Sequence, residues 1–345
     1  MSVEVIKPGL FSTLQDLGRV GYQHLGVPVS GAMDEVSHRV ANLLLGNDEG
    51  EATLEITLMG PILRFRQGAW AALCGADLGA TIVPPGTDAA SADPLPLNTP
   101  AWLAPGSTLM FGKRRAGLRA YLAVRGGFDV ALVMGSRSTH VRGGIGGLGG
   151  RALRKGDELP LRAGDEAKAL AAPVPLPRTA DRALSALHAS VAGSPMRVIK
   201  GREWDQFTRE AQATFLSQDA VVGSQSERMA SRLQGPVLAR LVEGDMLSEA
   251  VSFGTVQVPP EGLPIVLMAD RQSSGGYPRI AQVVTVDLPR LAQIMPGESV
   301  RFERVELAVA QRLLLERARH FAELRSALGQ ARDHAASSIV GGLHA

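Results

Sequence analysis

The chain has 345 residues, 45% of them hydrophobic, and its 36 Lys and Arg nearly balance its 34 Asp and Glu, for a formal net charge of +2. This composition predicts a globular protein of one large or two medium domains, and it excludes nucleic acid as an expected partner because no dense basic run is present. No apolar stretch approaches the roughly 20 residues of a membrane-spanning helix, so no membrane contact is expected. The N-terminus shows no secretory signal, and a single cysteine, Cys74, leaves no partner for an internal disulfide, so we expect a cytoplasmic protein.

Many short strands are predicted, because 39 glycines and 21 prolines imply frequent turns. We expect an N-terminal β-barrel-like domain over 1–165, an Ala/Pro-rich linker region over 166–195 and a second β domain over 196–305. Apolar spacing at 37–47 predicts one short helix ended by Gly46. Periodicity alone does not distinguish barrels from sandwiches.

The C-terminal part is predicted to be helical over 306–328, because Leu307, Leu314, Phe321 and Leu328 recur every seven residues. This helix either packs on its own domain or docks on a partner chain. The tail over 329–345 is expected to be disordered.

A polar loop is predicted within residues 8–34, where glycines and prolines interrupt any periodicity. Its candidate ligand-binding side chains are Asp16, Arg19, His24, Ser30 and Asp34. The strand predicted over 52–58 carries Glu55, and a carboxylate in an apolar strand needs a partner, for which an arginine is expected.

A second polar cluster follows an apolar strand, at residues 264–278 (PIVLMADRQSSGGYP). Its candidate residues are Asp270, Arg271, Gln272, Ser273, Ser274, Gly275, Gly276 and Tyr277. The two glycines are expected to adopt positive φ and let the backbone approach a ligand. Arg271 suits a carboxylate, and Gln272 both donates and accepts, so the cluster suits a small ligand with carbonyl and amide groups. A polar β-turn without function is the alternative.

Other motifs give weaker functional predictions, or none. The literal G-x-G-x-x-G at 144–149 is not followed by a segment long enough for a dinucleotide-binding helix. Arg137, beside this glycine loop, is a candidate for binding an anion or substrate. The seven histidines show no metal-ligand spacing, so no metal site is predicted. Without a Met-Lys pair, the chain is not expected to carry biotin.

Several ordered motifs together resemble the allophanate hydrolase subunit 2 family, also described as biotin-dependent carboxyltransferase-like proteins. They are TLQDLGR (13–19), GVPVSGAMD (26–34), ANLLLGN (41–47), CGAD (74–77), AYLAVRGGFD (120–129), GSRST (135–139), GRALRKGD (150–157) and the 264–278 segment. The sequence differs at Ser273 and Ser274, where two threonines are usual, and at Arg125, where an alanine is common. The resemblance implies a mostly β fold with two cyclophilin-like β-barrel domains, a few short helices and a C-terminal helix.

The resemblance also implies an enzyme subunit of the ATP-dependent 5-oxoprolinase type, which opens 5-oxoproline to glutamate. It would act with a B-type subunit (Kip-type inhibitor or allophanate hydrolase subunit 1-like) and an A-type lactam-utilisation subunit, with ATP, alone or as its Mg²⁺ complex, in the assembled enzyme. In this hypothesis Arg271 and Arg19 bind anions, and Asp270, Asp34 and Asp16 orient the amide, bind a metal–phosphate complex or act as acid or base. Gln272, Ser273 and Ser274 hydrogen-bond the substrate, and His24 shuttles a proton.

Two other functions remain open. One is the carboxyltransferase component of a urea carboxylase or allophanate pathway system, which would use carboxybiotin carried by a partner. The other is a non-catalytic regulatory partner of a Kip-type kinase inhibitor.

Overall fold

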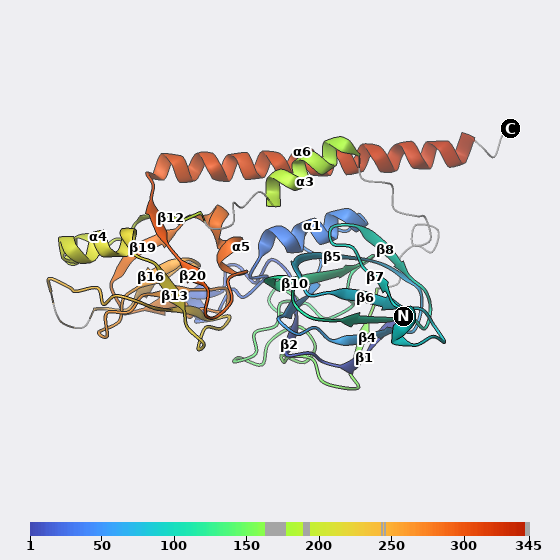
Figure 1. Cartoon of the computed structure of the whole chain (residues 1–345), viewed down its shortest axis with the longest axis horizontal. Helices are drawn as coiled ribbons and strands as arrows, with labels where there is room; N and C mark the ends of the chain where they lie inside the picture. The colour runs from blue at the N-terminus through green and yellow to red at the C-terminus, as the bar shows by residue number, and fades with distance from the viewer. Residues whose placement is uncertain (163–176, 189–193, 243, 245, 342–345) are drawn as a thin grey trace. The chain divides into compact units, whose positions relative to one another are not determined.

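Two compact units make up this computed structural model, which describes residues 1–162, 177–188, 194–242, 244 and 246–341 (Figure 1). Unit 1 comprises Met1–Leu17, Glu35–Ala189 and Arg317–Ala345, and unit 2 comprises Gly18–Asp34 and Ser190–Glu316. Residues 18–34 thus group with unit 2, although the sequence suggested one domain over 1–165. The reason is visible at Met33, which packs into the core of unit 2.

Unit 1 contains two antiparallel sheets. The first has the strand order β11-β1-β4-β9-β6-β7, and the second has the order β2-β3-β10-β5-β8. The strands are β1 (Ser2–Lys7), β2 (Phe11–Gln15), β3 (Thr53–Thr57), β4 (Ile62–Phe65), β5 (Ala69–Asp77), β6 (Ala80–Val83), β7 (Asp93–Pro94), β8 (Pro100–Leu103), β9 (Thr108–Phe111), β10 (Ala116–Val124) and β11 (Glu158–Pro160). A short 3₁₀ helix, η2 (Ala89–Ser91), precedes β7.

Helix α1 (Glu35–Leu45) packs on β5 and β10, and it ends before Gly46, whose φ of 78° fits the left-handed position that glycine tolerates, as predicted. The strand β3 contains Glu55, which accepts a hydrogen bond from the Tyr121 hydroxyl at 2.8 Å and lies 4.0 Å from the Arg119 guanidinium. The expected arginine is therefore present, with a tyrosine beside it. Cys74 is buried in β5.

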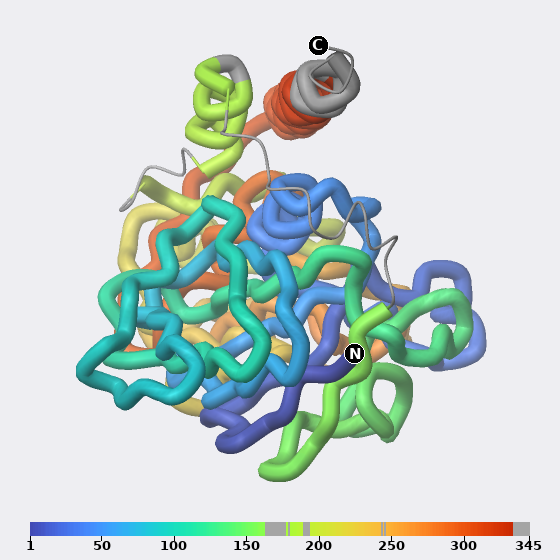
Figure 2. Tube along the Cα trace, turned by 90° about the vertical axis from the view of Figure 1, so that its right-hand side faces the viewer, coloured from blue at the N-terminus to red at the C-terminus, as the bar shows by residue number. Residues whose placement is uncertain are grey.

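Three helices of unit 1 share one apolar cluster. It joins α1 to α3 (Arg178–His188) and to the C-terminal part of α6 (Leu307–Gly341) through residues such as Leu184, Phe321 and Leu324. Figure 2 shows α3 and α6 side by side, with α6 seen nearly end-on. The second half of α6 therefore packs within this chain, but on unit 1 and not on the barrel domain that precedes it in sequence. Docking on a partner chain stays a prediction.

Two element boundaries differ from the sequence expectation. Helix α3 lies within the predicted linker region, the rest of which falls largely outside the described residues. Its apolar residues Ala180, Ala183, Leu184 and Leu187 follow helical spacing that the surrounding Ala/Pro-rich composition obscured. Helix α6 continues past 328 because Gly329 is followed by alanine-rich sequence of high helix propensity. Residues 342–345 of the predicted tail are not described.

Unit 2 is built on one eight-stranded sheet in the order β20-β13-β14-β17-β16-β19-β12-β21. The two end strands, β20 (Ser299–Val300) and β21 (Phe302–Arg304), are separated by only one residue, so the sheet curls into a nearly closed barrel. The inner strands are β12 (Met196–Lys200), β13 (Ala220–Val222), β14 (Ala230–Gln234), β16 (Thr255–Gln257), β17 (Ile265–Leu267) and β19 (Arg279–Val283). The mostly β fold predicted from the sequence is confirmed.

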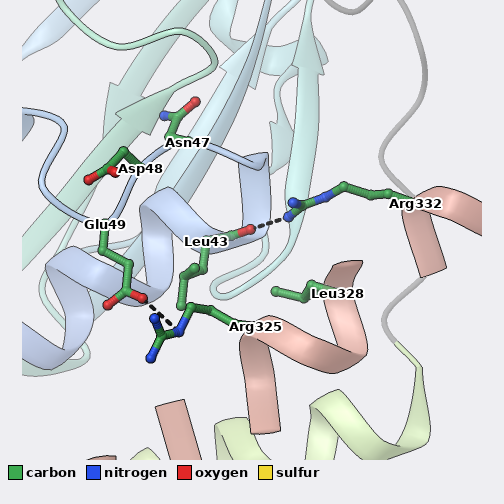
Figure 3. A pocket seen from close by; sticks show the side chains of 7 residues that line it. All are labelled: Leu43, Asn47, Asp48, Glu49, Arg325, Leu328 and Arg332. Atoms are coloured by element: carbon green, nitrogen blue, oxygen red, sulfur yellow. Dashed lines mark hydrogen bonds and ion pairs between the residues drawn. The ribbon is translucent and has the colours of Figure 1, made fainter. Parts of the chain in front are cut away.

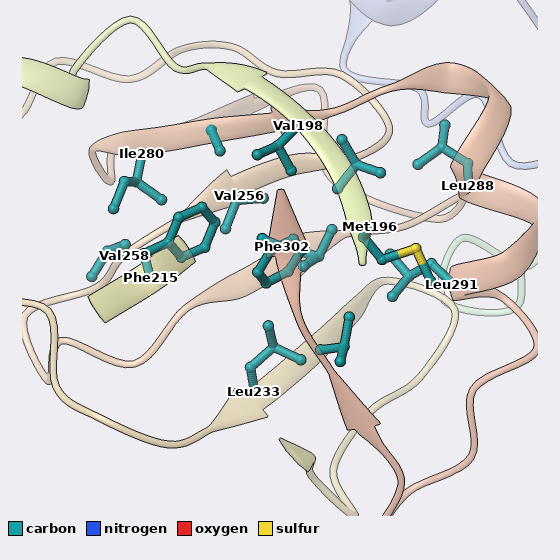
Figure 4. Packing of buried hydrophobic residues seen from close by; sticks show 14 of the residues in the cluster. Met196, Val198, Phe215, Leu233, Val256, Val258, Ile280, Leu288, Leu291 and Phe302 are labelled. Atoms are coloured by element: carbon teal, nitrogen blue, oxygen red, sulfur yellow. The ribbon is translucent and has the colours of Figure 1, made fainter. Parts of the chain in front are cut away.

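The barrel of unit 2 is filled by aliphatic and aromatic side chains, among which Phe215 and Phe302 stack at 4.6 Å (Figure 4). Outside the barrel, β15 (Glu249–Ala250) pairs with β18 (Ser274–Gly275). The helices are η1 (Gln23–Leu25), η3 (Trp204–Gln206), α4 (Arg209–Ser217), η4 (Thr285–Asp287) and α5 (Leu288–Leu291). Among the helices of the described segments, none is long and apolar enough to cross a membrane.

Candidate functional site

The predicted 270–277 cluster begins where β17 ends, opposite the chain that leads into β14. The backbone N–H of Asp270 donates to the Arg228 carbonyl at 2.9 Å, so the two residues are neighbours just beyond the adjacent ends of β14 and β17. The Arg228 side chain then reaches the Asp270 carboxylate with two N–H groups, Nε to Oδ2 at 2.8 Å and Nη2 to Oδ1 at 2.9 Å. This is the bidentate fork that guanidinium and carboxylate groups form best.

The same guanidinium also holds the second predicted segment. Its Nη2 donates to the Gly31 carbonyl at 2.7 Å, within the GVPVSGAMD motif. The Arg228 side chain therefore contacts both the Ser30–Gly31 segment and the Asp270–Arg271 segment of unit 2. Sequence reasoning missed Arg228 because its partners lie 42 and 197 positions away and no local pattern distinguishes it.

Several polar atoms next to this junction are buried and have no hydrogen-bond partner among the described residues. They are the Ser30 hydroxyl, the Arg271 Nε and the Gln272 side-chain carbonyl. Ser30 also has a φ of 57°, a left-handed conformation that is uncommon for a residue other than glycine and that concentrates at functional sites. Together the three side chains offer a cationic donor, an amide acceptor and a hydroxyl that does both.

The Arg271 guanidinium is partly desolvated. Burial lowers its pKa from the ordinary value, and the neighbouring Asp270 carboxylate partly opposes this. One nitrogen, Nη1, makes a long contact of 3.4 Å to the Met268 carbonyl, and the carbon Cζ lies 5.9 Å from the centre of the Phe253 ring. A partly desolvated cation of this kind interacts strongly with an anionic ligand.

The loop after Arg271 is held by backbone pairing. The Ser273 carbonyl accepts from the Val251 N–H at 3.2 Å, and the exposed Ser274 and Gly275 form β18. Gly275 and Gly276 do not adopt positive φ, contrary to expectation. Gly275 instead lies close to the Gln257 amide, since a Cβ there would be 2.6 Å from Gln257 Nε2. Tyr277 is 45% exposed, and its carbonyl accepts from Gln257.

The remaining predicted residues of unit 2 lie in different environments. Arg19 is fully buried, and its N–H closes a loop onto the Val29 carbonyl at 2.8 Å. Asp34 is buried and accepts from Gln293 Nε2 at 2.7 Å. His24 is exposed in η1. The structure therefore connects Ser30 with 270–272 through Arg228, whereas the exposed His24 lies outside this connection.

Asp16 and Arg137 come together in unit 1. The Asp16 carboxylate accepts from the hydroxyls of Ser136 (2.6 Å) and Ser138 (2.5 Å) and from the Arg137 N–H (2.5 Å). The Arg137 guanidinium points elsewhere, with Nη1 3.6 Å from the Glu51 carboxylate. Asp16 thus fixes the GSRST turn, and its roles in ligand binding or proton transfer stay predictions.

A cavity of about 490 Å³ lies in unit 1 between the end of α1 and α6 (Figure 3). Its two arginines contact the opposite wall: Arg325 lies 3.0 Å from Glu49, and Arg332 donates to the Leu43 carbonyl at 2.5 Å. These contacts dock α6 on α1. Across the described part of the chain, no group of three or more His, Cys, Asp or Glu side chains is placed to hold a metal ion.

Comparison with known proteins identifies the family. The family model described as carboxyltransferase domain, subdomain A and B, matches residues 25–304. The chain is 37% identical to the C-type subunit of 5-oxoprolinase from Escherichia coli (strain K12), over 93% of this chain and 97% of that relative. It is also 35% identical to the C-type subunit of 5-oxoprolinase from Haemophilus influenzae, over 88% of this chain and 91% of that relative.

Larger proteins contain the same region. Urea amidolyase of Saccharomyces cerevisiae is 33% identical over 87% of this chain, which corresponds to 16% of that protein. The crystal structure of Kluyveromyces lactis urea amidolyase superposes with a TM-score of 0.80 at 29% identity, over 92% of this chain and 19% of that one. The chain thus spans less than a fifth of either urea amidolyase. The resemblance noted in the sequence is confirmed, and the chain belongs to the family of carboxyltransferase domains with subdomains A and B.

Proposed function

We propose that the chain is the C-type subunit of a multi-subunit, ATP-dependent enzyme that opens the cyclic amide 5-oxoproline to glutamate. The two relatives named as 5-oxoprolinase subunits support this, because the alignment covers nearly all of this chain and nearly all of the Escherichia coli relative. The word subunit in that name also supports partner chains, which we propose to be the A-type and B-type proteins.

The observation that carries the proposal is the group of buried, unpartnered polar atoms on Ser30, Arg271 and Gln272. A 5-oxoproline molecule has a carboxylate that suits the Arg271 guanidinium and a ring N–H that suits the Gln272 carbonyl oxygen. Its lactam oxygen suits a hydroxyl donor such as Ser30. Each atom left without a partner among the described residues would thus gain one from the substrate, which favours binding because buried polar groups need hydrogen bonds.

The chemistry of the reaction explains why positioning suffices. An unstrained lactam is a poor electrophile, and in this proposal ATP supplies the phosphoryl group that makes its oxygen a leaving group. The residues of this chain would orient the lactam and stabilise negative charge, which accounts for most of the catalysis in phosphoryl transfer. Arg19, Asp34, Asp16, Arg137, His24 and the 273–277 loop remain proposed contributors.

A second candidate is the carboxyltransferase component of a urea carboxylase system. The fold likeness to urea amidolyase, at a TM-score of 0.80, favours it, and a urea molecule offers the same carbonyl and N–H groups as a lactam. Biotin would then be carried by a partner chain. The regulatory function beside a Kip-type inhibitor stays a prediction without a specific observation in its favour.

The test is reconstitution with purified A-type and B-type proteins from the same organism. We expect glutamate formation and ATP hydrolysis with 5-oxoproline only in the complete mixture. Turnover of urea with a biotin carboxylase and a biotin carrier, and none of 5-oxoproline, would favour the second candidate. A stable complex that is inactive in both assays would reject both enzymatic proposals.

A further inference from the structure

The pairing of Arg228 with Asp270 assigns these residues a role that the sequence did not indicate. We infer that Arg228 is a positioning residue that locks the Ser30 and Arg271 segments together, and that Asp270 holds this lock and does not exchange protons with the substrate. The inference deepens the proposed function, on which its kinetic test rests.

Both oxygens of the Asp270 carboxylate accept hydrogen bonds from Arg228. Asp270 Oδ2 accepts from Arg228 Nε at 2.8 Å, and Oδ1 accepts from Nη2 at 2.9 Å. A general acid or base needs an oxygen within hydrogen-bonding reach of the proton that it transfers. Here one acceptor site on each oxygen is already taken by the guanidinium, so the carboxylate is committed to holding Arg228. Both side chains are largely buried, 7% exposed for Arg228 and 11% for Asp270, which keeps water from competing for the pair.

One nitrogen of the Arg228 guanidinium makes two hydrogen bonds. Nη2 of Arg228 donates both to Asp270 and to the Gly31 carbonyl, so each of its two hydrogens has an acceptor. Only a planar guanidinium presents Nε and two Nη2 hydrogens in this fixed arrangement, which a lysine ammonium cannot reproduce. The contact at Gly31 therefore depends on the fork at Asp270.

The Arg228–Asp270 pair holds in place two segments that carry unpartnered polar atoms. Ser30 precedes Gly31 and Arg271 follows Asp270, and each carries one of the unpartnered polar atoms next to this junction. Ser30 has a φ of 57°, and such a conformation persists where neighbouring contacts enforce it. The bond from Arg228 to the next carbonyl is such a contact. The ligand-facing groups are thus Ser30, Arg271 and Gln272, and the Arg228–Asp270 pair sets the distance between their segments.

A matched control exists in the same unit. Arg197 forms a similar fork with Asp287, from Nε at 3.0 Å and Nη2 at 2.5 Å. This pair ties the start of β12 to η4, and its fork bridges neither the Ser30 nor the Arg271 segment. Substitutions in it report on the loss of a buried ion pair without loss of the lock.

The experiment compares Arg228→Lys, Asp270→Asn and their double variant with Arg197→Lys and Asp287→Asn, all in the complete enzyme with 5-oxoproline and ATP. We expect Arg228→Lys and Asp270→Asn each to lower kcat/KM by roughly 10- to 100-fold, since small misplacements have effects of this size. The pH profile of kcat/KM should keep the wild-type shape. The double variant should be no worse than the poorer single variant, because both remove the same lock. The control variants should change Tm but leave kcat/KM within about 3-fold.

A second readout separates this inference from the proposed function. Hydrogen exchange of the full chain alone should increase in peptides over 28–34 and 270–277 for Arg228→Lys and Asp270→Asn, and in neither peptide for the controls. If the wild-type complex never turns over 5-oxoproline, the proposed function fails, and hydrogen exchange still decides on the lock. The lock is rejected if both peptides exchange as in wild type. It is also rejected if Asp270→Asn removes one limb of the pH profile and lowers kcat by more than about 10⁴-fold, as loss of a proton-transferring residue would.

Discussion

Two arginine–aspartate pairs of unit 2 have nearly the same geometry and different surroundings. In each, Nε and Nη2 of the arginine reach the two oxygens of one carboxylate. Asp287 is completely buried and also accepts from the backbone N–H of Arg197, so its partners belong to the frame of the barrel. The Arg228–Asp270 pair instead joins two loops whose neighbouring polar atoms lack partners among the described residues. The contrast teaches that pairing chemistry alone does not reveal a site, whereas the polar groups left unsatisfied beside it do.

The largest effect, on the free energy of unfolding, is expected from breaking the Arg197–Asp287 pair. Asp287→Ala leaves the Arg197 guanidinium, whose side chain is 30% exposed, without its carboxylate. Losing one partner of a fully buried pair destabilises a protein by about 3–5 kcal/mol, so we expect a loss near the lower end of that range. Urea unfolding of the full chain measures this change. The control is Asp219→Ala, which breaks an exposed pair with Arg301 and should change the free energy of unfolding by about 1 kcal/mol or less. Equal effects of the two variants would contradict the structural distinction.

His38, in unit 1, is a buried titratable side chain whose side-chain hydrogen-bond partner, the Thr53 hydroxyl, carries no charge. His38 is completely buried, its Nδ1 lies 2.8 Å from the Thr53 hydroxyl, and burial lowers its pKa to about 4. The neutral ring is thus favoured in the folded state. The associated stability is fully present above the unfolded pKa of 6.5 and is lost as the pH falls toward 4.

We expect wild type to lose roughly 3 kcal/mol more than His38→Gln between pH 7 and pH 4, from a shift of about 2.5 pKa units. Chemical unfolding of both proteins across that range measures the difference. Parallel pH dependences would show that His38 is not the group responsible.

Arg271→Met tests the loops joined by the Arg228–Asp270 pair, where polar atoms lack partners among the described residues. We expect kcat/KM for 5-oxoproline in the complete enzyme to fall by about 100-fold, the size of losing a charged contact to substrate. The free energy of unfolding should stay the same or rise, because burial lowers the pKa of Arg271 and so disfavours its charged form. Strong destabilisation with unchanged kinetics would place Arg271 with the frame instead.

The smallest effect concerns the docking of α6. Arg332 is partly buried, donates to the Leu43 carbonyl at the end of α1, and has its pKa lowered by burial and by Arg125. Because burial of the cation offsets part of the bond, Arg332→Ala should cost only about 1 kcal/mol. Thermal unfolding measures this, with the exposed Arg319→Ala as the control. A loss no greater than that of the control would show that Arg332 does not contribute to the docking of α6.

The fold was predictable where local signals sufficed. Helix α1 with its Gly46 end and the apolar strand that precedes Asp270 follow from apolar spacing and turn residues. Helix α3 was missed because prolines and alanines around it mask its spacing. The grouping of residues 18–34 with unit 2 could not be predicted, since a loop without periodicity does not indicate which core its Met33 enters.

The candidate site was predictable as two sets of polar residues but not as an arrangement. Ser30, Arg271 and Gln272 were among the candidates, and nothing local separated them from His24 or Ser274. What separates them is burial and the absence of partners among the described residues, which only the fold determines. Arg228, the residue that joins the two segments, had no signal at all because side-chain contacts across 197 positions leave no trace in a single sequence.

That separation along the chain also has a consequence for biosynthesis. The Gly31 segment leaves the ribosome 197 residues before Arg228, and the strands that close the barrel, β20 and β21, come later still. At about 5–20 residues per second, the segment waits roughly 10–40 s for its partner. During that interval the strands of unit 1 that flank the loop in sequence can already form, so a nascent chain carries a Gly31 segment that cannot bond to Arg228 until Arg228 has been made.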